Sequence, residues 1–170
     1  MKAPTAHEHK AHAPRSAGCM IITCSDTRIA DTDNSGQLIQ KLLKDHGHAV
    51  VGYHLVKDDP AEIQLWIMRA VTNEGVQALI INGGTGISRR DSTFEAVDAM
   101  LEKRLPGFGE IFRLLTYQEM GSPAIMSRAT AGIIKGRVLF SVPGSEHAVR
   151  LAMEKLILPE LGHLVQQLSK

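Results

Sequence analysis

The sequence of 170 residues lacks the features that mark membrane and nucleic-acid-binding proteins. No apolar run approaches the roughly 20 residues needed to cross a bilayer. The amino terminus also lacks the apolar core of a signal peptide. Nineteen basic residues nearly balance 18 acidic residues, so there is no basic stripe to predict nucleic-acid binding. We therefore expect a cytoplasmic protein with neither membrane nor nucleic-acid partners.

Cysteine is scarce, and the two cysteines present, Cys19 and Cys24, fall in one predicted strand. Side chains alternate between the faces of a strand, so an odd separation places these two on opposite faces. They should therefore be unable to form a disulfide with each other. Two unpaired thiols are typical of a reducing compartment such as the cytoplasm.

Residues 1–17 show no hydrophobic periodicity and consist largely of alanine, proline, histidine and lysine. This composition predicts a disordered tail. Its histidines His7, His9 and His12 have no second cluster of ligands that would complete a metal site. Residues 18–170 are expected to form a single domain, because the chain is 44% hydrophobic and shows no internal repeat.

Apolar runs alternate with amphipathic segments along this domain. The predicted strands are 19–23, 48–56, 78–81, 132–134 and 137–142. The predicted helices are 37–46, 60–73, 92–105, 108–120 and a last one from 146 that Pro159 kinks or breaks. The last two strands are joined by a hairpin-like turn. The alternation predicts an α/β fold, a three-layer αβα sandwich around a mostly parallel sheet.

The most informative stretch is 77–96, where an apolar strand ends at Gly83-Gly84-Thr85-Gly86. Glycine can take positive φ and allows a ligand to approach backbone N–H groups. A helix then begins, as the capping-box spacing from Ser92 to Glu95 indicates. This order of strand, glycine loop and helix N terminus is typical of anion sites. A tight turn before a capped helix is the simpler interpretation, and neither the P-loop nor the dinucleotide fingerprint matches.

Two carboxylates, Asp58 and Asp91, follow predicted strands. The carboxyl ends of parallel strands form the ligand-binding edge of a sheet. Magnesium prefers one or two carboxylates together with water and phosphate oxygens, so this pair is a candidate metal site for phosphoryl or nucleotidyl transfer. The alternative makes Asp91 the cap of the helix that follows it and Asp59 the cap of the helix at Pro60. Spacing alone does not separate Asp58 from Asp59.

Arg89 and Arg90 follow the glycines and offer forked donors suited to phosphate, although a solvated loop is the simpler interpretation for either one. The loops 25–36, 57–59 and 83–91 should meet at the carboxyl edge of the sheet, with 143–145 as a fourth wall. No histidine stands in a recognisable relation to a serine, so the sequence predicts no catalytic triad.

The motif that begins with GGTG and continues through Arg90-Asp91 to Glu95-Ala96 resembles the signature of the molybdenum cofactor biosynthesis family of MoaB and MogA. The similarity continues at 106–110 (PGFGE), at Ser127-Arg128 and at Pro143-Gly144. It covers about residues 19–168 and is closer to the MoaB branch. The resemblance implies a molybdopterin-binding-like fold and homo-oligomers, either trimers or hexamers.

The resemblance further implies adenylylation of molybdopterin with ATP and Mg²⁺ and release of pyrophosphate. Under this interpretation, Asp58 and Asp91 are the catalytic, metal-associated carboxylates. The substrate-binding residues that it implies are Ser25, Ser35, Gly36, Gly83, Gly84, Thr85, Gly86, Arg90, Ser127, Pro143 and Gly144. The alternatives are a non-catalytic molybdopterin-binding or assembly protein of the same pathway and an unrelated nucleotide-binding domain.

Overall fold

A computed structural model describes residues 16–89 and 91–170. The predicted tail therefore lies almost wholly outside the described residues, as does Arg90. Ala17, which we assigned to the tail, is buried, and its carbonyl accepts a hydrogen bond from the Ala49 N–H at 2.9 Å. Packing of the domain thus begins before the predicted boundary.

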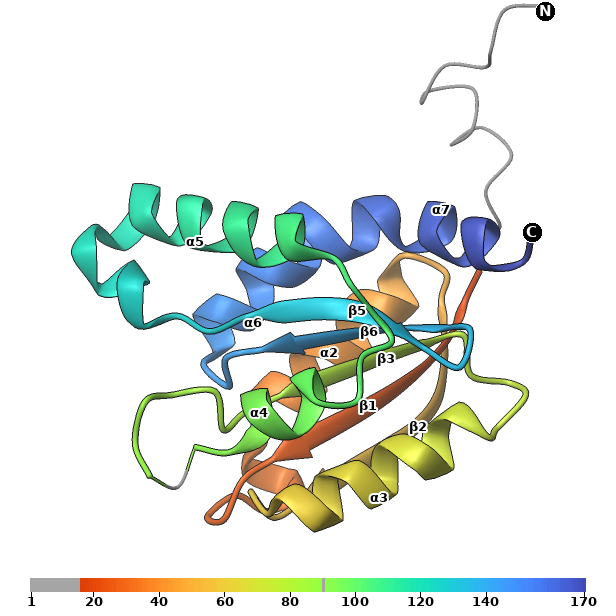
Figure 1. Ribbon diagram of the computed structural model, residues 1–170, viewed down its shortest axis with the longest axis horizontal. Helices are drawn as coiled ribbons and strands as arrows, with labels where there is room; N and C mark the ends of the chain where they lie inside the picture. The colour runs from red at the N-terminus through yellow and green to blue at the C-terminus, as the bar shows by residue number, and fades with distance from the viewer. Residues whose placement is uncertain (1–15, 90) are drawn as a thin grey trace, which may run out of the picture.

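A six-stranded sheet forms the centre of the fold (Figure 1). Its strands, in the spatial order β2-β1-β3-β6-β5-β4, are Ala49–Val56, Gly18–Cys24, Ala78–Asn82, Arg137–Val142, Thr130–Ile134 and Lys103–Arg104. The first four run parallel, and β5 pairs antiparallel with both β6 and β4. The mostly parallel sheet is confirmed, whereas the two-residue strand β4 was not predicted.

Helices cover both faces of the sheet, which confirms the three-layer sandwich (Figure 1). One face carries α2, α5, α6 and α7, and the other carries α3 and α4. Their bounds, in this order, are Asn34–Asp45, Pro106–Met120, Glu146–Ala152, Leu158–Leu168, Pro60–Val71 and Thr93–Asp98. No helix in the described part of the chain has the length and apolarity required to span a bilayer.

Strand alternation builds two hydrophobic cores, one on each face of the sheet. Cys19 and Ile21 enter the core beneath α2 and α5, whereas Ile22 and Cys24 enter the core beneath α3 and α4. The prediction that the two cysteines point to opposite faces is confirmed. Both are buried free thiols, and burial raises the pKa of each to about 12.

Several predicted helix boundaries differ from the structure: α5 begins at Pro106, where we predicted 108, and α3 ends at Val71, where we predicted 73. Two larger differences have a clear physical reason. Helix α2 begins three residues before the predicted Gln37, because the Asp33 side chain accepts a hydrogen bond from the Gly36 N–H and caps the helix there. Helix α4 ends at Asp98 and does not reach Pro106. The chain after it pairs with β5 instead, since the Glu102 N–H donates to the Ile133 carbonyl at 2.9 Å.

The carboxyl-terminal helix is not broken at Pro159. A π-helical turn, η3 (Met153–Ile157), joins α6 to α7 just before the proline. Proline cannot donate the usual helical hydrogen bond, and the wider π turn fits a chain that lacks this bond. The predicted disturbance is therefore a change of helical pitch.

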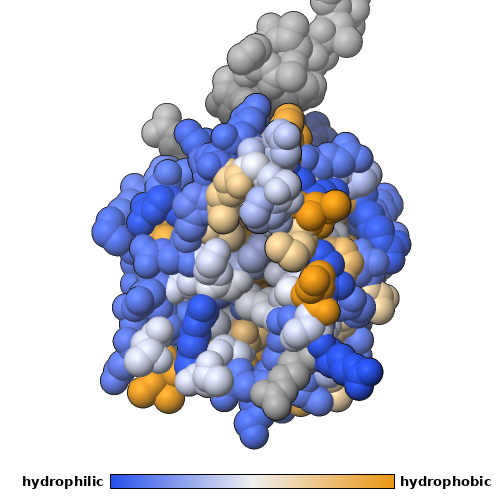
Figure 2. Space-filling view, turned by 90° about the vertical axis from the view of Figure 1, so that its left-hand side faces the viewer, coloured by the Kyte–Doolittle hydropathy of each residue, from blue (hydrophilic) through white to orange (hydrophobic). Residues whose placement is uncertain are grey.

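The strand order places β1 beside β3, while the helices that follow them lie on opposite faces. Helix α2 follows β1 on one face, and α4 follows β3 on the other. Such a switch point opens a crevice outside the carboxyl ends of the strands, where ligands bind in open α/β sheets. Figure 2 faces this edge of the molecule.

Candidate functional site

The glycine loop, residues 83–91, leaves β3 at the switch point. Gly83 and Gly84 have φ values of 110° and 50°, which favour glycine. A side chain at Gly83 would also overlap the carbonyl of Cys24. The loop is tied down by the Thr93 N–H, which donates to the Gly84 carbonyl at 3.0 Å. The first two glycines are therefore required by the backbone whether or not a ligand binds.

Arg128, on the segment that follows the 3₁₀-helix η2 (Ser122–Met126), holds the outer side of the glycine loop. Its Nε donates to the Thr85 carbonyl at 3.0 Å, and Nη2 donates to the Gly86 carbonyl. Nη2 also lies 3.5 Å from the Asp91 carbonyl. The guanidinium forms an ion pair with Glu95. The Arg128 side chain thus binds two carbonyls of the glycine loop, those of Thr85 and Gly86.

The loop also has unpaired backbone donors. A trans peptide points its N–H away from its C=O, so the Thr85 N–H points away from Thr93, whose N–H binds the Gly84 carbonyl of the same peptide. No described residue accepts a hydrogen bond from the N–H of Gly84 or Thr85. Unpaired amides of this kind bind anions such as phosphate.

A cleft of about 480 Å³ lies beside these amides. Seven of the residues predicted to form the site line it, namely Gly84, Thr85, Gly86, Asp91, Ser127, Pro143 and Gly144. The structure therefore brings together the glycine loop, the segment before β5 and the loop after β6. The rest of the wall is largely apolar and comes from α5, η2 and the start of α6.

Asp91 is the carboxylate that faces the cleft. Its Oδ2 accepts a hydrogen bond from the Ser88 N–H at 2.8 Å. The Ser88 hydroxyl lowers the pKa of Asp91 most. Desolvation opposes it, and the Ser88 and Gly86 amides and the charge of Arg128 lower the pKa further. Asp91 is therefore ionised at neutral pH. The alternative prediction, that Asp91 caps α4, is wrong, because Ser92 occupies that position.

Asp58 has a different environment. Its Oδ1 accepts hydrogen bonds from the hydroxyls of Ser92 and Thr93 at 3.0 Å each, and from the Ser92 N–H at 3.3 Å. This carboxylate therefore occupies the N terminus of α4, packs against Gly84 and does not line the cleft. The helix terminus that we predicted to receive a ligand anion is closed by the protein itself.

The capping box predicted at the start of α4 does not form. The Ser92 hydroxyl donates to Asp58 instead of capping its own helix. Glu95, the other predicted partner, forms an ion pair with Arg128. Asp59 is an ordinary N-cap, since it accepts a hydrogen bond from the Glu62 N–H at 2.9 Å, as predicted for the helix at Pro60. The structure thus distinguishes the roles of Asp58 and Asp59, which sequence spacing could not.

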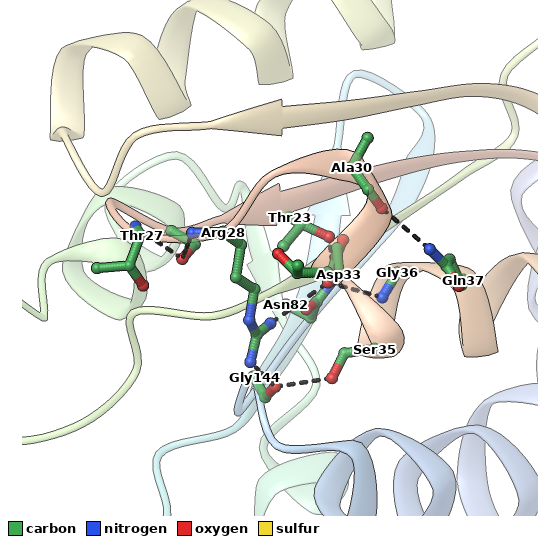
Figure 3. A network of polar contacts seen from close by, with 12 residues as sticks. Thr23, Thr27, Arg28, Ala30, Asp33, Ser35, Gly36, Gln37, Asn82 and Gly144 are labelled. Carbon is green, nitrogen blue, oxygen red and sulfur yellow. Dashed lines mark hydrogen bonds and ion pairs between the residues drawn. The ribbon is translucent and has the colours of Figure 1, made fainter.

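Three predicted substrate-binding residues lie away from the cleft lining, because the protein uses their polar groups. The Ser25 hydroxyl accepts turn hydrogen bonds from the N–H groups of Thr27 and Arg28. The Ser35 hydroxyl donates to the Gly144 carbonyl at 2.8 Å, and Gly36 is buried against Asp33 (Figure 3). Gly83 also lies behind the lining, and Arg90 lies outside the described residues.

Sequence reasoning missed much of the apolar wall. Phe112, Thr116 and Met120 line the cleft from α5. Their spacing of four residues places them on one helix face, so this signal was present in the sequence. His147 also lines the cleft, and its Nε2 lies 2.8 Å from a carboxylate oxygen of Glu119. No sequence pattern marked His147 for this position.

Within residues 16–89 and 91–170, no three His, Cys, Asp or Glu side chains cluster as a metal site. One ionised carboxylate, Asp91, nevertheless faces a cleft beside free amides. Magnesium usually takes one or two carboxylates and completes its coordination with water and substrate phosphates. The donor set therefore fits a cation that arrives with a phosphorylated substrate and does not fit a preformed protein cage.

Comparison with known proteins gives a consistent result. Residues 20–163 match the family model described as a probable molybdopterin binding domain. The chain is 51% identical over 164 residues to molybdenum cofactor biosynthesis protein B of Halalkalibacterium halodurans, covering 96% of each chain. It is 50% identical over 164 residues to the protein of the same name from Bacillus subtilis, again covering 96% of each chain.

Solved structures are similar over nearly the whole chain. The crystal structure of a molybdenum cofactor biosynthesis protein B superposes with a TM-score of 0.90 and 52% identity, covering 93% of this chain and 99% of that one. The tungsten cofactor synthesizing protein MoaB from Pyrococcus furiosus gives a TM-score of 0.83 and 37% identity, covering 93% and 100%. A MogA structure gives 0.79 and 28%, covering 89% and 99%.

Proposed function

Because this chain belongs to the molybdopterin-binding family of molybdenum cofactor biosynthesis proteins, we propose that it adenylylates molybdopterin with ATP and Mg²⁺. The place in molybdenum cofactor biosynthesis follows from the family. The specific reaction is the proposal, and the cleft beside the glycine loop is its site.

The reaction makes modest demands on the protein. A phosphate oxygen of molybdopterin attacks the α-phosphorus of ATP, a new P–O bond forms, and the bond to the leaving pyrophosphate breaks. The attacking phosphate is already ionised, so no catalytic base is needed. Positioning and charge neutralisation carry most of such a reaction. The amides of Gly84 and Thr85 would bind phosphate oxygens, and Asp91 would hold Mg²⁺, which neutralises charge on the phosphates when bound.

The apolar wall suits the rest of the substrates. Met120, Pro123 and Met126 line the cleft with exposed apolar side chains, whereas Phe112 is fully buried. Flat ring systems such as adenine and pterin bind well against apolar and sulfur-containing side chains. The cleft therefore offers an apolar surface for a ring and polar donors for a phosphate in one space.

The observation that carries the proposal is the meeting of unpaired amides and an ionised carboxylate, Asp91, in one cleft. The test incubates the protein with molybdopterin, ATP and Mg²⁺ and follows product by mass spectrometry. We expect adenylylated molybdopterin and pyrophosphate in equal amounts, and none without Mg²⁺. If the wild-type protein forms no adenylylated product, the proposed reaction is wrong.

A second candidate is a non-catalytic molybdopterin-binding or assembly protein of the same pathway. The position of Asp58 favours it, because this carboxylate is hydrogen-bonded at the N terminus of α4 and does not face the cleft. Such a protein would bind molybdopterin yet show the same negligible turnover before and after Asp58→Asn. Unequal turnover of these two proteins would exclude it.

We also propose that the protein forms homo-oligomers, trimers or hexamers. Large hydrophobic side chains are exposed on α5 and η2, namely Ile111, Leu114, Tyr117, Met120, Ile125 and Met126. Hydrophobic groups interrupt the otherwise mostly hydrophilic face in Figure 2. Exposed apolar surface of this kind marks interaction sites. Size-exclusion chromatography with light scattering should give three or six times the mass of the chain, and a monomer would contradict the proposal.

A further inference from the structure

An ion pair between the partly exposed Arg28 and the buried Asp33 lies next to Gly144 (Figure 3). Nη1 of Arg28 is 3.4 Å from Oδ1 of Asp33, and the Asp33 side chain is fully buried. Nothing in the proposed reaction uses either residue. Burying a carboxylate is costly unless it is well paired, so this pair calls for a structural or functional reason.

Asp33 is fixed from several directions. Its Oδ1 accepts a hydrogen bond from the Gly36 N–H at 3.0 Å, and its Oδ2 accepts one from the Tyr53 hydroxyl at 2.7 Å. Burial, together with the neighbouring Asp33 carboxylate, raises the pKa of Tyr53, so the phenol remains a donor. A side chain at Gly36 would overlap Asp33. Asp33 is thus a rigid anchor for Arg28.

Arg28 and Ser35 converge on one carbonyl. Nη2 of Arg28 and the Ser35 hydroxyl each donate to the Gly144 carbonyl at 2.8 Å (Figure 3). Gly144 is also packed closely against the glycine loop, since a Cβ there would lie 2.9 Å from the Gly83 Cα. Two short hydrogen bonds, one of them from a charged donor, therefore set the orientation of the peptide that joins Gly144 to Ser145.

A fixed carbonyl also fixes the next amide. The described chain contains no cis peptide bond, so the Ser145 N–H points opposite to the Gly144 carbonyl. Arg28 and Ser35 do not line the cleft, whereas Gly144 and Ser145 do. No described residue accepts a hydrogen bond from the Ser145 N–H. This amide is therefore available on the cleft side of the wall.

We propose that Arg28 is a positioning residue for phosphate binding, because it fixes the Gly144 carbonyl and thereby aims the Ser145 N–H into the cleft. This inference rests on the proposed function, since it names a further donor to the same phosphorylated substrates. A reversed peptide would present a carbonyl oxygen to a phosphate and repel it.

An arginine also binds carbonyls of the glycine loop, which lines the same cleft. There, Arg128 donates to the carbonyls of Thr85 and Gly86. Arg28 and Arg128 thus each fix carbonyls of a loop that lines the cleft, and the N–H groups of Thr85 and Ser145 have no acceptor among the described residues. The Arg28–Asp33 ion pair is weak evidence for a stabilising role, because Arg28 is partly exposed and even buried ion pairs can often be replaced by apolar groups without loss of stability. Its value here lies in geometry.

The Ser145 amide can be tested by a matched pair of variants. Ser145 has a φ of −74°, which proline can adopt, so Ser145→Pro removes the N–H without forcing the backbone. Ser145→Ala keeps the N–H and loses the same side-chain cap to Ala148. The probe is inorganic pyrophosphate with Mg²⁺, titrated by calorimetry. We expect roughly tenfold weaker affinity for the proline variant than for the alanine variant, and equal affinities would overturn the proposal.

The positioning role of Arg28 needs its own variant. Arg28→Met with Asp33→Asn removes the hydrogen bond to Gly144 without leaving a buried charge, and asparagine can still accept from the Gly36 N–H. We expect a melting temperature within a few degrees of the wild type, weaker pyrophosphate binding, and a Ser145 amide resonance in ¹⁵N spectra that no longer shifts on titration. Unchanged affinity and an unchanged shift would overturn the proposal.

Two further outcomes are decisive. If the double variant shows no thermal unfolding transition, the test uses Ser35→Ala instead, which removes one of the two hydrogen bonds to the Gly144 carbonyl. This variant should bind pyrophosphate a few-fold more weakly than the wild type. Affinity equal to that of the wild type would then overturn the proposal. If wild-type protein binds pyrophosphate with no shift of the Gly84 and Thr85 amides, the proposed site fails, and this inference fails with it. Shifts of those two amides without one at Ser145 overturn this inference alone.

Discussion

Asp58 and Asp91 lie against the same glycine loop, yet their surroundings differ. Asp58 packs behind Gly84 and is hydrogen-bonded to three donors at the N terminus of α4. Asp91 packs beside Gly86 and faces the cleft. The comparison teaches that two aspartates with similar positions in the sequence, each after a strand, can have different roles. One shapes the loop, and the other is available to a ligand.

The largest effect should come from removing the charge that faces the cleft. Asp91→Asn keeps an oxygen that can accept from the Ser88 N–H but cannot hold Mg²⁺ as well. We expect adenylylation to fall by about 100-fold or more, with unfolding free energy changed by less than about 0.5 kcal/mol. Steady-state kinetics and thermal unfolding measure the two quantities.

Asp45→Asn is the matched control for Asp91→Asn, because Asp45 is an exposed carboxylate at the end of α2 that pairs with Lys41. It should leave turnover at the wild-type value. Equal turnover of the wild type and Asp91→Asn would remove the distinction between the two carboxylates.

The two glycines beside the carboxylates sharpen the comparison. Gly84 has positive φ, and a side chain there would overlap Asp58, so Gly84→Ala should destabilise the fold by about 1–3 kcal/mol. A Cβ at Gly86 would lie 2.5 Å from Oδ2 of Asp91, a partly buried side chain that can shift by rotating away from Gly86. Gly86→Ala should therefore reduce turnover more than stability. Urea unfolding and kinetics on both variants test this, and the reverse pattern would contradict the account.

Removing the acceptor at the helix N terminus should have a moderate effect. Asp58→Ala leaves the hydroxyls of Ser92 and Thr93 without their acceptor. We expect a loss of about 1 kcal/mol in unfolding free energy, or roughly 2–4 °C in melting temperature for a chain of this size. Asp58→Asn keeps an acceptor oxygen and should lose less. If the two variants melt at the same temperature, the capping role assigned to Asp58 is wrong.

The smallest effect concerns pH. The pKa of Asp91 is lowered, chiefly by the Ser88 hydroxyl, so the charged form is favoured in the folded protein. Its contribution to stability is present above the ordinary pKa of about 3.9 and is lost as pH falls through the lowered value. Ser88→Ala should raise the pKa of Asp91 toward its ordinary value. Side-chain carbon resonances followed during acid titration report this directly, and an unshifted titration would refute the assigned cause.

Much of the fold was predictable because it depends on local patterns. Buried strands such as Ala78–Asn82 are continuous apolar runs, and α3 carries both its proline and its aspartate cap. The strand β4 was not predictable from local sequence. It has two residues, and it exists because the chain after α4 pairs with β5.

The site was predictable in part. The glycine motif and Asp91 could be predicted as parts of one site because they are close in sequence and belong to the same loop. The two arginines that orient the walls were not, since each reaches across a long sequence separation, from Arg128 to Thr85 and from Arg28 to Gly144. The orientation of Asp58 was equally hidden, because spacing says nothing about which neighbour a carboxylate contacts.

The central claim is that phosphates bind between the glycine loop and residues 143–145, with the cation at Asp91. The most direct test is a crystal structure with a non-hydrolysable ATP analogue and Mn²⁺, whose anomalous signal locates the cation. We predict a manganese peak at the Asp91 carboxylate and phosphate oxygens within hydrogen-bonding distance of the Thr85 amide. A nucleotide bound elsewhere, or a cation ligated by Asp58 alone, would contradict the account.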